Sequence, residues 1–105
     1  MSSATGARYA AGQVKATNAE LKVLTVGFTP KKFRVVNLTN QIQVEWNSGL
    51  PVGTNLKRIA DGTLSVITSG VEPGSDAAGN KGLKLPVLAD INDTTTESLA
   101  WEAFG

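Results

Sequence analysis

Short apolar runs separated by turn-forming residues are the feature of this sequence that most constrains its fold. No segment keeps the i, i+3, i+4, i+7 spacing of an amphipathic helix for more than about two turns, so any helix would be short. Residues 41–46 (QIQVEW) instead alternate polar and apolar side chains, which is the period of a strand with one solvated face. The pattern predicts an all-β protein.

Turn formers divide the chain into strand-sized pieces. Asp61-Gly62 is a two-residue hairpin signal, and Pro30 interrupts the strand before it because proline has no backbone N–H. Residues 47–55 and 71–82 are rich in Gly, Pro and Asn, and we expect them to be loops. Pro86 restricts its strand to a sheet edge or an irregular crossing. The expected strands cover residues 21–26, 32–38, 41–46, 56–60, 63–68, 83–88 and 98–104.

Length and composition favour a single domain. The chain has 105 residues, of which 18% are charged and 11 are glycine, and this suits a compact β protein with many turns. About six to eight short strands of this kind form a β-sandwich or a small barrel. Residues 1–18 are small and polar without a clear period. We therefore expect an extended N-terminal arm, residues 1–18, and a β domain, residues 19–105.

Trp46 and Trp101 are expected to be core residues. Each is in phase with apolar neighbours on its strand, Trp46 with Val44 and Trp101 with Leu99. The alternative is that they form stacking platforms for a sugar, as in β-sandwich lectins, which would require exposed indole rings. The phase favours packing in the core.

The absence of cysteine and histidine removes most catalytic and metal chemistry. Disulfides and Ser-His-Asp or Cys-His arrangements are impossible, and zinc loses both of its preferred ligands. Glu45, Glu97 and Glu102 remain as carboxylates, but each alternates with apolar residues and is expected to face solvent. We therefore expect neither an enzyme nor a cofactor.

One polar loop could offer oxygen ligands to a calcium ion. It contains Asp90, Asn92, Asp93 and Glu97, but their spacing is not that of an EF-hand, and the turn glycine is missing. A solvated loop with Asx turns explains the same residues. We therefore expect no metal site there.

The charges are distributed unevenly along the chain. Residues 1–40 hold six basic and one acidic side chain, a balance of +5, whereas residues 41–105 hold four basic and eight acidic side chains, a balance of −4. The two parts could pair within a subunit, pair between subunits, or steer the basic part toward an acidic partner. Nucleic acid is not an expected partner, because the basic residues are dispersed and are not interleaved with stacking aromatics.

No targeting segment is recognised. Residues 1–12 contain a single arginine and no apolar core of signal-peptide length, and no run approaches the roughly 18–20 apolar residues of a membrane span. We expect a protein that is made in the cytoplasm and has no membrane partner.

Several motifs follow one another in a recognisable order. They are residues 27–39 (GFTPKKFRVVNLT), Glu45-Trp46, Asp61-Gly62-Thr63 and Thr68-Ser69-Gly70. Together they resemble the pattern of small structural proteins of tailed bacteriophages, most closely the capsid decoration (cement) proteins. The likeness covers residues 27–70 and, more weakly, 97–104. It implies a β-rich virion module, often a homotrimer, that binds the major capsid protein on the capsid exterior and stabilises the capsid.

If the resemblance holds, the N-terminal arm and the basic part of the chain would be binding features. Residues 21–26 are apolar on both faces, so they are either a subunit contact or a fully covered core strand. Lys31 and Lys32 would be solvated turn residues or would face an acidic neighbour. The candidate capsid or subunit contacts are Arg8, Tyr9, Val14, Lys15, Leu21, Val23, Lys31 and Lys32.

Two other kinds of function stay open. A tail-tube, head–tail joining or fibre-base module would share the β fold and the phage origin. A carbohydrate-binding β module would need at least one exposed aromatic side chain.

Overall fold

The chain folds into two antiparallel β-sheets packed face to face. The structure is a computed structural model, and it describes residues 8–16, 22–76, 78–86, 91–92 and 96–105. These residues form nine strands and no α-helix, and none of the described part is a helix that could cross a membrane. The strands are β1 (Tyr9–Lys15), β2 (Lys22–Thr25), β3 (Lys32–Asn37), β4 (Ile42–Asn47), β5 (Asn55–Arg58), β6 (Leu64–Ile67), β7 (Glu72–Ser75), β8 (Lys81–Leu85) and β9 (Ser98–Phe104).

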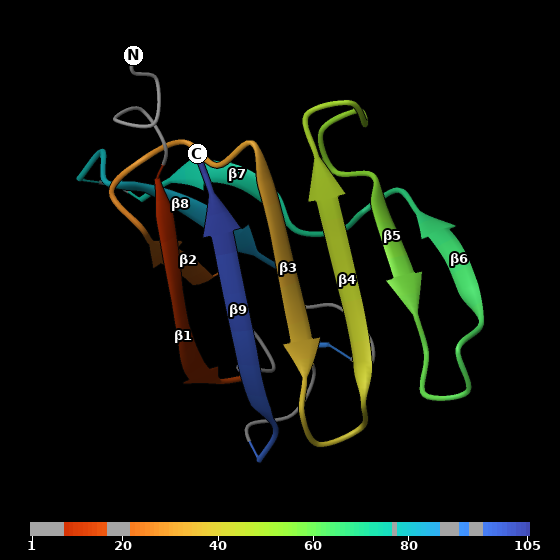
Figure 1. Ribbon diagram of the computed structural model, residues 1–105. Helices are drawn as coiled ribbons and strands as arrows, with labels where there is room; N and C mark the ends of the chain where they lie inside the picture. Colours follow the sequence, from red (N-terminus) through yellow and green to blue (C-terminus); the bar gives the residue numbers. More distant parts are fainter. Residues whose placement is uncertain (1–7, 17–21, 77, 87–90, 93–95) are drawn as a thin grey trace.

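The larger sheet has six strands in the order β1-β9-β3-β4-β5-β6, and the smaller has three in the order β2-β8-β7. Figure 1 shows the smaller sheet behind β1, β9 and β3, while β5 and β6 extend to one side. The last strand of the chain, β9, lies between β1 and β3 and pairs antiparallel with both. The expected all-β fold is confirmed, and the two open sheets make it a sandwich.

The two expected hairpins are also confirmed, and each has a local cause. Between β3 and β4, the Asn37 side-chain oxygen accepts hydrogen bonds from the N–H groups of Thr39 and Asn40, at 2.9 and 3.1 Å. Between β5 and β6, the Asp61 side chain accepts one from Thr63 N–H at 2.9 Å. Gly62 there has a φ of 93°, which favours glycine.

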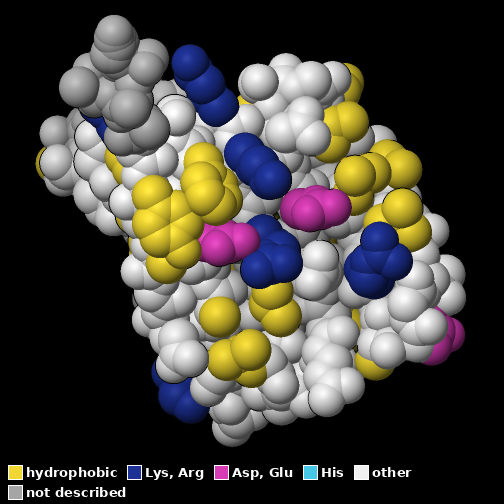
Figure 2. Space-filling view, in the orientation of Figure 1, with side chains coloured by type: hydrophobic (Ala, Val, Ile, Leu, Met, Phe, Trp, Pro, Cys, Tyr) yellow, Lys and Arg dark blue, Asp and Glu magenta, His cyan; other side chains and the backbone are white. Residues whose placement is uncertain are grey.

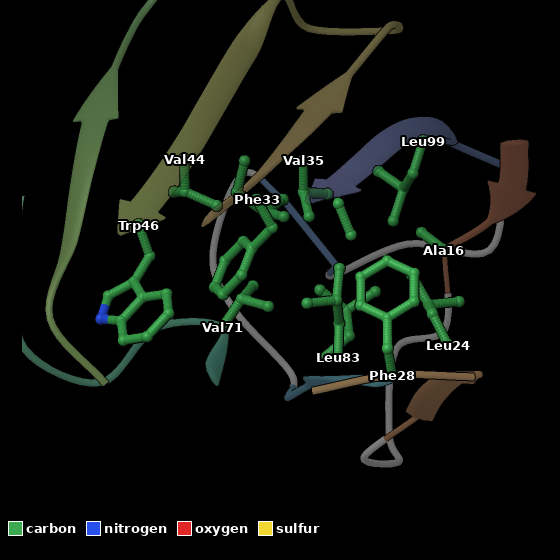
Figure 3. Close-up of a cluster of buried hydrophobic side chains, with 13 residues drawn as sticks. Ala16, Leu24, Phe28, Phe33, Val35, Val44, Trp46, Val71, Leu83 and Leu99 are labelled. Carbon is green, nitrogen blue, oxygen red and sulfur yellow. The ribbon is translucent and has the colours of Figure 1, made fainter. Parts of the chain in front are cut away.

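The core lies between the inner faces of the two sheets (Figure 3). Phe33 and Trp46 stack with their ring centroids 5.5 Å apart, and the Trp46 indole N–H donates to the Pro51 carbonyl at 3.2 Å. Trp46 is buried, as expected, whereas Trp101 lies on the same inner face but is half-buried. The fully or almost fully buried apolar residues are Ala16, Leu24, Phe28, Phe33, Val35, Val44, Trp46, Val71, Leu83, Leu85, Ile91, Leu99 and Ala103.

Two strands were not expected from the sequence. Residues 9–15, assigned to an arm separate from the domain, are extended but form β1 at the edge of the large sheet. Residues 72–75, expected to be part of a loop, form β7 at the edge of the small sheet. Pro73 has no backbone N–H, and an edge strand tolerates proline because only one of its sides is hydrogen-bonded to a neighbouring strand. These additions bring the number of strands to nine. Arg8 and the buried Ala16 flank β1, and the rest of the expected arm, residues 1–7 and 17–18, lies outside the described residues.

Strand β2 settles part of the ambiguity at residues 21–26. Leu24 is buried in the core, and Val23 and Val26 are half-buried. β8 approaches β2 so closely that a Cβ added at Gly82 would overlap the Leu24 carbonyl. Leu24 therefore belongs to the core, while β2 is an edge strand of the smaller sheet and is covered only in part.

The valines of the large sheet differ in burial, so they should contribute unequally to the free energy of unfolding. Val35 on β3 is completely buried, whereas Val66 on β6 is 62% exposed. Val35→Ala should lower the free energy of unfolding by about 2–3 kcal/mol, because it removes buried apolar surface and leaves a cavity. The matched Val66→Ala should change it by less than about 0.5 kcal/mol. Urea unfolding of both variants measures the difference, and equal losses would contradict the assigned core.

The β7–β8 turn predicts a specific pH dependence. Asp76 accepts hydrogen bonds from Asn80 N–H at 2.9 Å, from the Asn80 side-chain amide at 3.1 Å and from Ala78 N–H at 2.9 Å. These bonds, led by that from the Asn80 backbone, hold the pKa of Asp76 below its ordinary value of 3.8.

A lowered folded-state pKa stabilises the fold above the unfolded pKa, and this stabilisation is lost as pH falls through the folded value. Asp76→Asn should therefore flatten the loss of stability below about pH 4. Urea midpoints measured between pH 2 and 6 test this, and superimposable curves for the two proteins would refute it.

Candidate functional site

A basic cleft lies where the ends of several strands meet at one end of the sandwich. It encloses about 320 Å³ and is lined by Arg8, Phe28, Thr29, Lys31, Lys81 and Gly105. We call this set of residues the basic cleft. None of the described residues that line it is acidic.

Backbone hydrogen bonds hold the three cationic residues of the cleft in position. The Arg8 carbonyl accepts a hydrogen bond from Gly105 N–H at 3.0 Å, and Lys31 N–H donates to the Phe104 carbonyl at 2.7 Å. The Lys81 carbonyl accepts hydrogen bonds from the N–H groups of Val26 and Gly27 at 2.9 and 3.1 Å. The main chain beneath each charge is therefore fixed, although the side chains of all three residues are exposed.

The segment GFTPKK explains how the chain reaches this position. Gly27 has a φ of 87°, which turns the chain out of β2. Phe28 and Pro30 are buried, and Thr29, Lys31 and Lys32 are exposed. The buried pair anchors the connection, and the lysines are left at the surface where β3 begins.

Among the described residues, no acidic side chain pairs with a cation of the basic cleft. The ion pairs among the described residues are Arg34–Glu102 at 3.0 Å, on the outer face of the large sheet, and Lys84–Glu72 at 3.5 Å, on the small sheet. Neither includes Arg8, Lys31 or Lys81. Three positive charges at one opening, with no counter-charge from the described part of the chain, produce a local positive potential.

An aromatic pair lies beside the cleft on the outer face of the large sheet. The rings of Tyr9 and Phe104 are 4.9 Å apart, and Lys32 Nζ lies 5.6 Å from the centroid of the Phe104 ring. The register of the sheet causes this, because Phe104 is directly opposite Tyr9 on one side and Lys32 on the other. Tyr9 is 59% exposed. We call Tyr9, Lys32 and Phe104 the aromatic flank.

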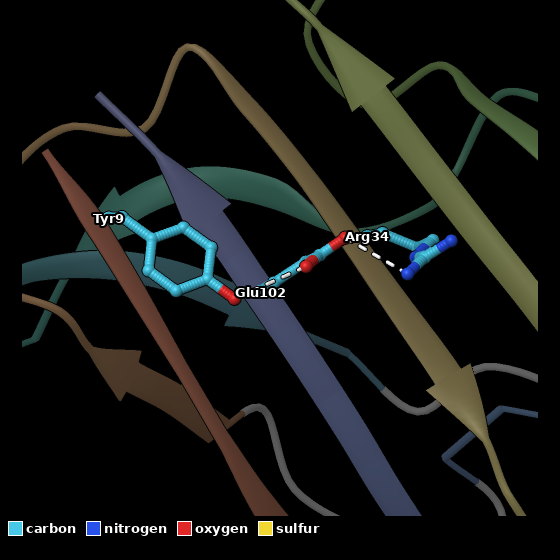
Figure 4. A network of polar contacts seen from close by, with 3 residues as sticks. All are labelled: Tyr9, Arg34 and Glu102. Atoms are coloured by element: carbon cyan, nitrogen blue, oxygen red, sulfur yellow. Dashed lines mark hydrogen bonds and ion pairs between the residues drawn. The ribbon is translucent and has the colours of Figure 1, made fainter. Parts of the chain in front are cut away.

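A chain of polar contacts connects the aromatic flank to the middle of the sheet (Figure 4). The Tyr9 hydroxyl donates to the Glu102 carboxylate at 3.4 Å, and the same carboxylate pairs with Arg34 at 3.0 Å. Figure 2 shows charged side chains across the middle of this face, with apolar side chains on both sides of them. Both partners of the ion pair are partly exposed, so the pair contributes little to stability.

The structure brings together only some of the candidate contact residues. Arg8 and Lys31 line the basic cleft, and Tyr9 and Lys32 belong to the aromatic flank. Val14 and Lys15 lie at the opposite end of β1, where Val14 is half-buried and Lys15 donates a hydrogen bond to Ser98 Oγ at 3.1 Å. Val23 is half-buried on β2, and Leu21 lies outside the described residues.

Two residues of this region were missed by the sequence analysis. Lys81 follows a glycine-rich segment, and no local pattern connects it with Arg8. Phe104 alternates with Trp101 and Ala103, the inward-facing residues of its strand, and shares the other face with Glu102. This alternation could have indicated that a large apolar side chain faces outward. Both residues reach the site only because β8 and β9 are placed there by the sheets.

The predicted polar loop is described only in part. Asp90 and Asp93 lie outside the described residues, while Asn92 is buried and its amide donates to the Pro86 carbonyl at 2.9 Å. Glu97 is buried beside Asn40, whose amide donates to it at 3.4 Å. The expectation that Glu97 faces solvent is therefore wrong. Within the described residues no three His, Cys, Asp or Glu side chains are grouped as metal ligands.

Comparison of this chain with protein-family models, with curated proteins and with solved structures found no match. The interpretation of the site therefore depends on its geometry and charge.

The basic cleft holds like charges with no acidic partner among the described residues, so these charges should lower the stability of the fold. Lys31→Glu should raise the free energy of unfolding by about 0.2–1 kcal/mol at low salt, because it places an acid beside Arg8 and Lys81. Lys84→Glu is the matched control and should lower it, because it breaks the ion pair with Glu72 and sets two carboxylates side by side. Thermal unfolding at low and high ionic strength tests both, since salt should weaken both effects. A destabilising Lys31→Glu would contradict the charge assignment.

Proposed function

We propose that this protein is a non-enzymatic structural component of a virion that binds the outer surface of a tailed-phage capsid and stabilises it. The observation that carries the proposal is the basic cleft with its adjoining aromatic flank. It combines three cations that no acid of the described residues pairs with, an exposed tyrosine and a β-sheet scaffold. These are features of a surface that binds another protein, and the resemblance of residues 27–70 to decoration proteins supports the choice of partner.

The composition of the site suits protein binding. Tyrosine and arginine are enriched at the centres of protein interfaces, where an aromatic ring provides contact area and a charged group provides orientation. Tyr9 and Arg8 are neighbours at the start of β1, and Lys31 and Lys32 are neighbours at the start of β3. An acidic surface of the major capsid protein would be attracted to this end and oriented by it.

Capsid stabilisation would follow from attachment across neighbouring capsid subunits. A compact domain of 105 residues offers a limited contact area, so association of several copies would increase the strength of attachment. We propose a homotrimer for this reason. The exposed apolar side chain of Leu64 on the edge strand β6 is available for contacts between copies.

The lack of cysteine and histidine supports a non-enzymatic role without a cofactor. Attachment to a capsid also requires no catalytic group. The protein would be made in the cytoplasm of the host cell and would then lie on the exterior of the virion.

A carbohydrate-binding module is the second candidate, and one observation favours it. Tyr9 is exposed, packs against the half-buried Phe104 and lies beside the Arg34–Glu102 pair, so a sugar could stack on the tyrosine ring and hydrogen-bond to the charged groups. Trp46 no longer supports this function, because it is buried and its indole N–H is bonded to Pro51. A tail or head–tail joining module would share the phage origin but would occupy another part of the virion.

Sedimentation tests the proposed function directly. Alone, the purified protein should sediment as three copies of the 10.9 kDa chain, and it should co-sediment saturably with empty capsids of the phage that carries it. Binding should weaken as salt increases, because exposed charges are screened. Co-sedimentation with tails and not with capsids would support the tail alternative. Binding to immobilised polysaccharide that Tyr9→Ala abolishes would support the carbohydrate alternative.

A further inference from the structure

We propose that the basic cleft and the open edge of β1 together bind an acidic, extended peptide segment of the partner protein. This inference rests on the proposed function for the source of the segment, which would be a capsid protein.

The cleft selects a negatively charged group. Arg8, Lys31 and Lys81 surround one opening, and among the described residues no acid pairs with any of them. A bound carboxylate would gain charge-assisted hydrogen bonds and would relieve the repulsion between the three cations. Arg8 could bind it with two parallel N–H groups, and the lysines would act as point charges.

The edge of β1 selects an extended backbone. The Arg8 carbonyl accepts a hydrogen bond from Gly105 N–H, and Ala16 N–H donates to the Glu97 carbonyl. Both pairs continue the β1–β9 register at its two ends, beyond Tyr9–Phe104 and Lys15–Ser98. Because hydrogen-bonded pairs alternate in an antiparallel ladder, the even-numbered residues of β1 bond to β9. The N–H and C=O groups of Tyr9, Ala11 and Gln13 therefore point away from β9, toward the edge of the sheet that no other described strand covers.

The cleft and the edge are continuous. Arg8 lines the cleft and immediately precedes Tyr9, the first residue of β1. A peptide strand added along the seven residues of β1 would span about 23 Å, and acidic residues at one of its ends would enter the cleft. Strand addition provides affinity through the main chain, and side-chain pockets provide specificity.

The charges of β1 argue against a second copy of the same strand as the occupant. Arg8 and Lys15 lie at its two ends, and the described strand contains no acidic residue. In a two-fold antiparallel pair of β1 strands, each Arg8 would lie near the Lys15 of the other copy. Basic residues on an edge strand discourage such self-pairing, whereas an acidic strand would complement them.

Nucleic acid fits the cleft less well than a peptide. Single-stranded nucleic acids bind where a basic groove is lined with aromatic side chains on which bases stack. The aromatic residue in the cleft is Phe28, which is only 7% exposed. Tyr9 is on the outer face and is packed against Phe104.

The first experiment measures peptide binding by fluorescence anisotropy. The probe is a labelled, capped seven-residue peptide with three glutamates followed by alternating valine and threonine, and its control has glutamines in place of the glutamates. The glutamate peptide should bind, and Lys31→Gln combined with Lys81→Gln should raise its Kd by about fivefold or more. Lys15→Gln, the matched loss of charge at the far end of β1, should change it by less than about twofold.

Circular dichroism and thermal unfolding confirm that the variants are folded. Equal binding of the two peptides, or an unchanged Kd in the double variant, would overturn the assignment of the cleft. Tighter binding of a single-stranded oligonucleotide of the same charge would overturn the choice of a peptide.

Amide exchange measured by NMR tests the role of the β1 edge. The peptide should newly protect the N–H groups of Tyr9, Ala11 and Gln13, while those of Ala10, Gly12 and Val14 should change little because they already face β9. Peptide binding without this alternating protection would overturn strand addition.

Capsid sedimentation of the same variants separates this inference from the proposed function. If the double variant occupies capsids as fully as the unchanged protein, the cleft is not the attachment site and the inference fails while the function stands. If the protein binds the acidic peptide as expected but no capsid, the proposed function fails and the cleft stands as a peptide site.

Discussion

The position of β9 between β1 and β3 is the constraint on which the rest of the large sheet depends. Its seven residues pair along their whole length with β1 and along six positions with β3. Leu99 and Ala103 on its inner face are completely buried. Among the described strands β1 pairs with β9 alone, so this edge strand is ordered by the last strand of the chain. Folding therefore requires contacts between residues far apart in sequence, which is typical of β-sandwiches.

The same arrangement creates the candidate site. Antiparallel pairing brings the start of β1, the end of β9 and the start of β3 to one end of the sheet, and β8 begins nearby in the second layer. Arg8, Lys31 and Lys81 meet there although they are distant along the chain. The gathering of like charges is unfavourable in the isolated protein, and functional surfaces commonly carry such a cost in stability. A partner with negative charge would convert it into binding free energy.

Much of the fold could be predicted because its signals are local. The alternation of residues 41–46 and the Asp61-Gly62 turn each depend on neighbours within a few residues, and both hairpins are present. β1 and β7 could not be predicted in this way. Their glycine, alanine and proline residues have weak strand propensity, and they become strands because a longer strand offers them a partner. Glu97 was misjudged for a related reason, since its burial depends on the β3–β4 turn packing over it.

By itself, the sequence determined the all-β class, the hairpins, the inward phase of Trp46 and the absence of histidine and cysteine chemistry. It also indicated a basic N-terminal part, because net charge is a property of composition. Only the tertiary structure decided which of those charges share a cleft, and that Lys81 and Phe104 belong beside them. The physical reason is that turn propensity and side-chain alternation act over a few residues, whereas the site is assembled by strand order and register between residues up to 95 positions apart, as Tyr9 and Phe104 are.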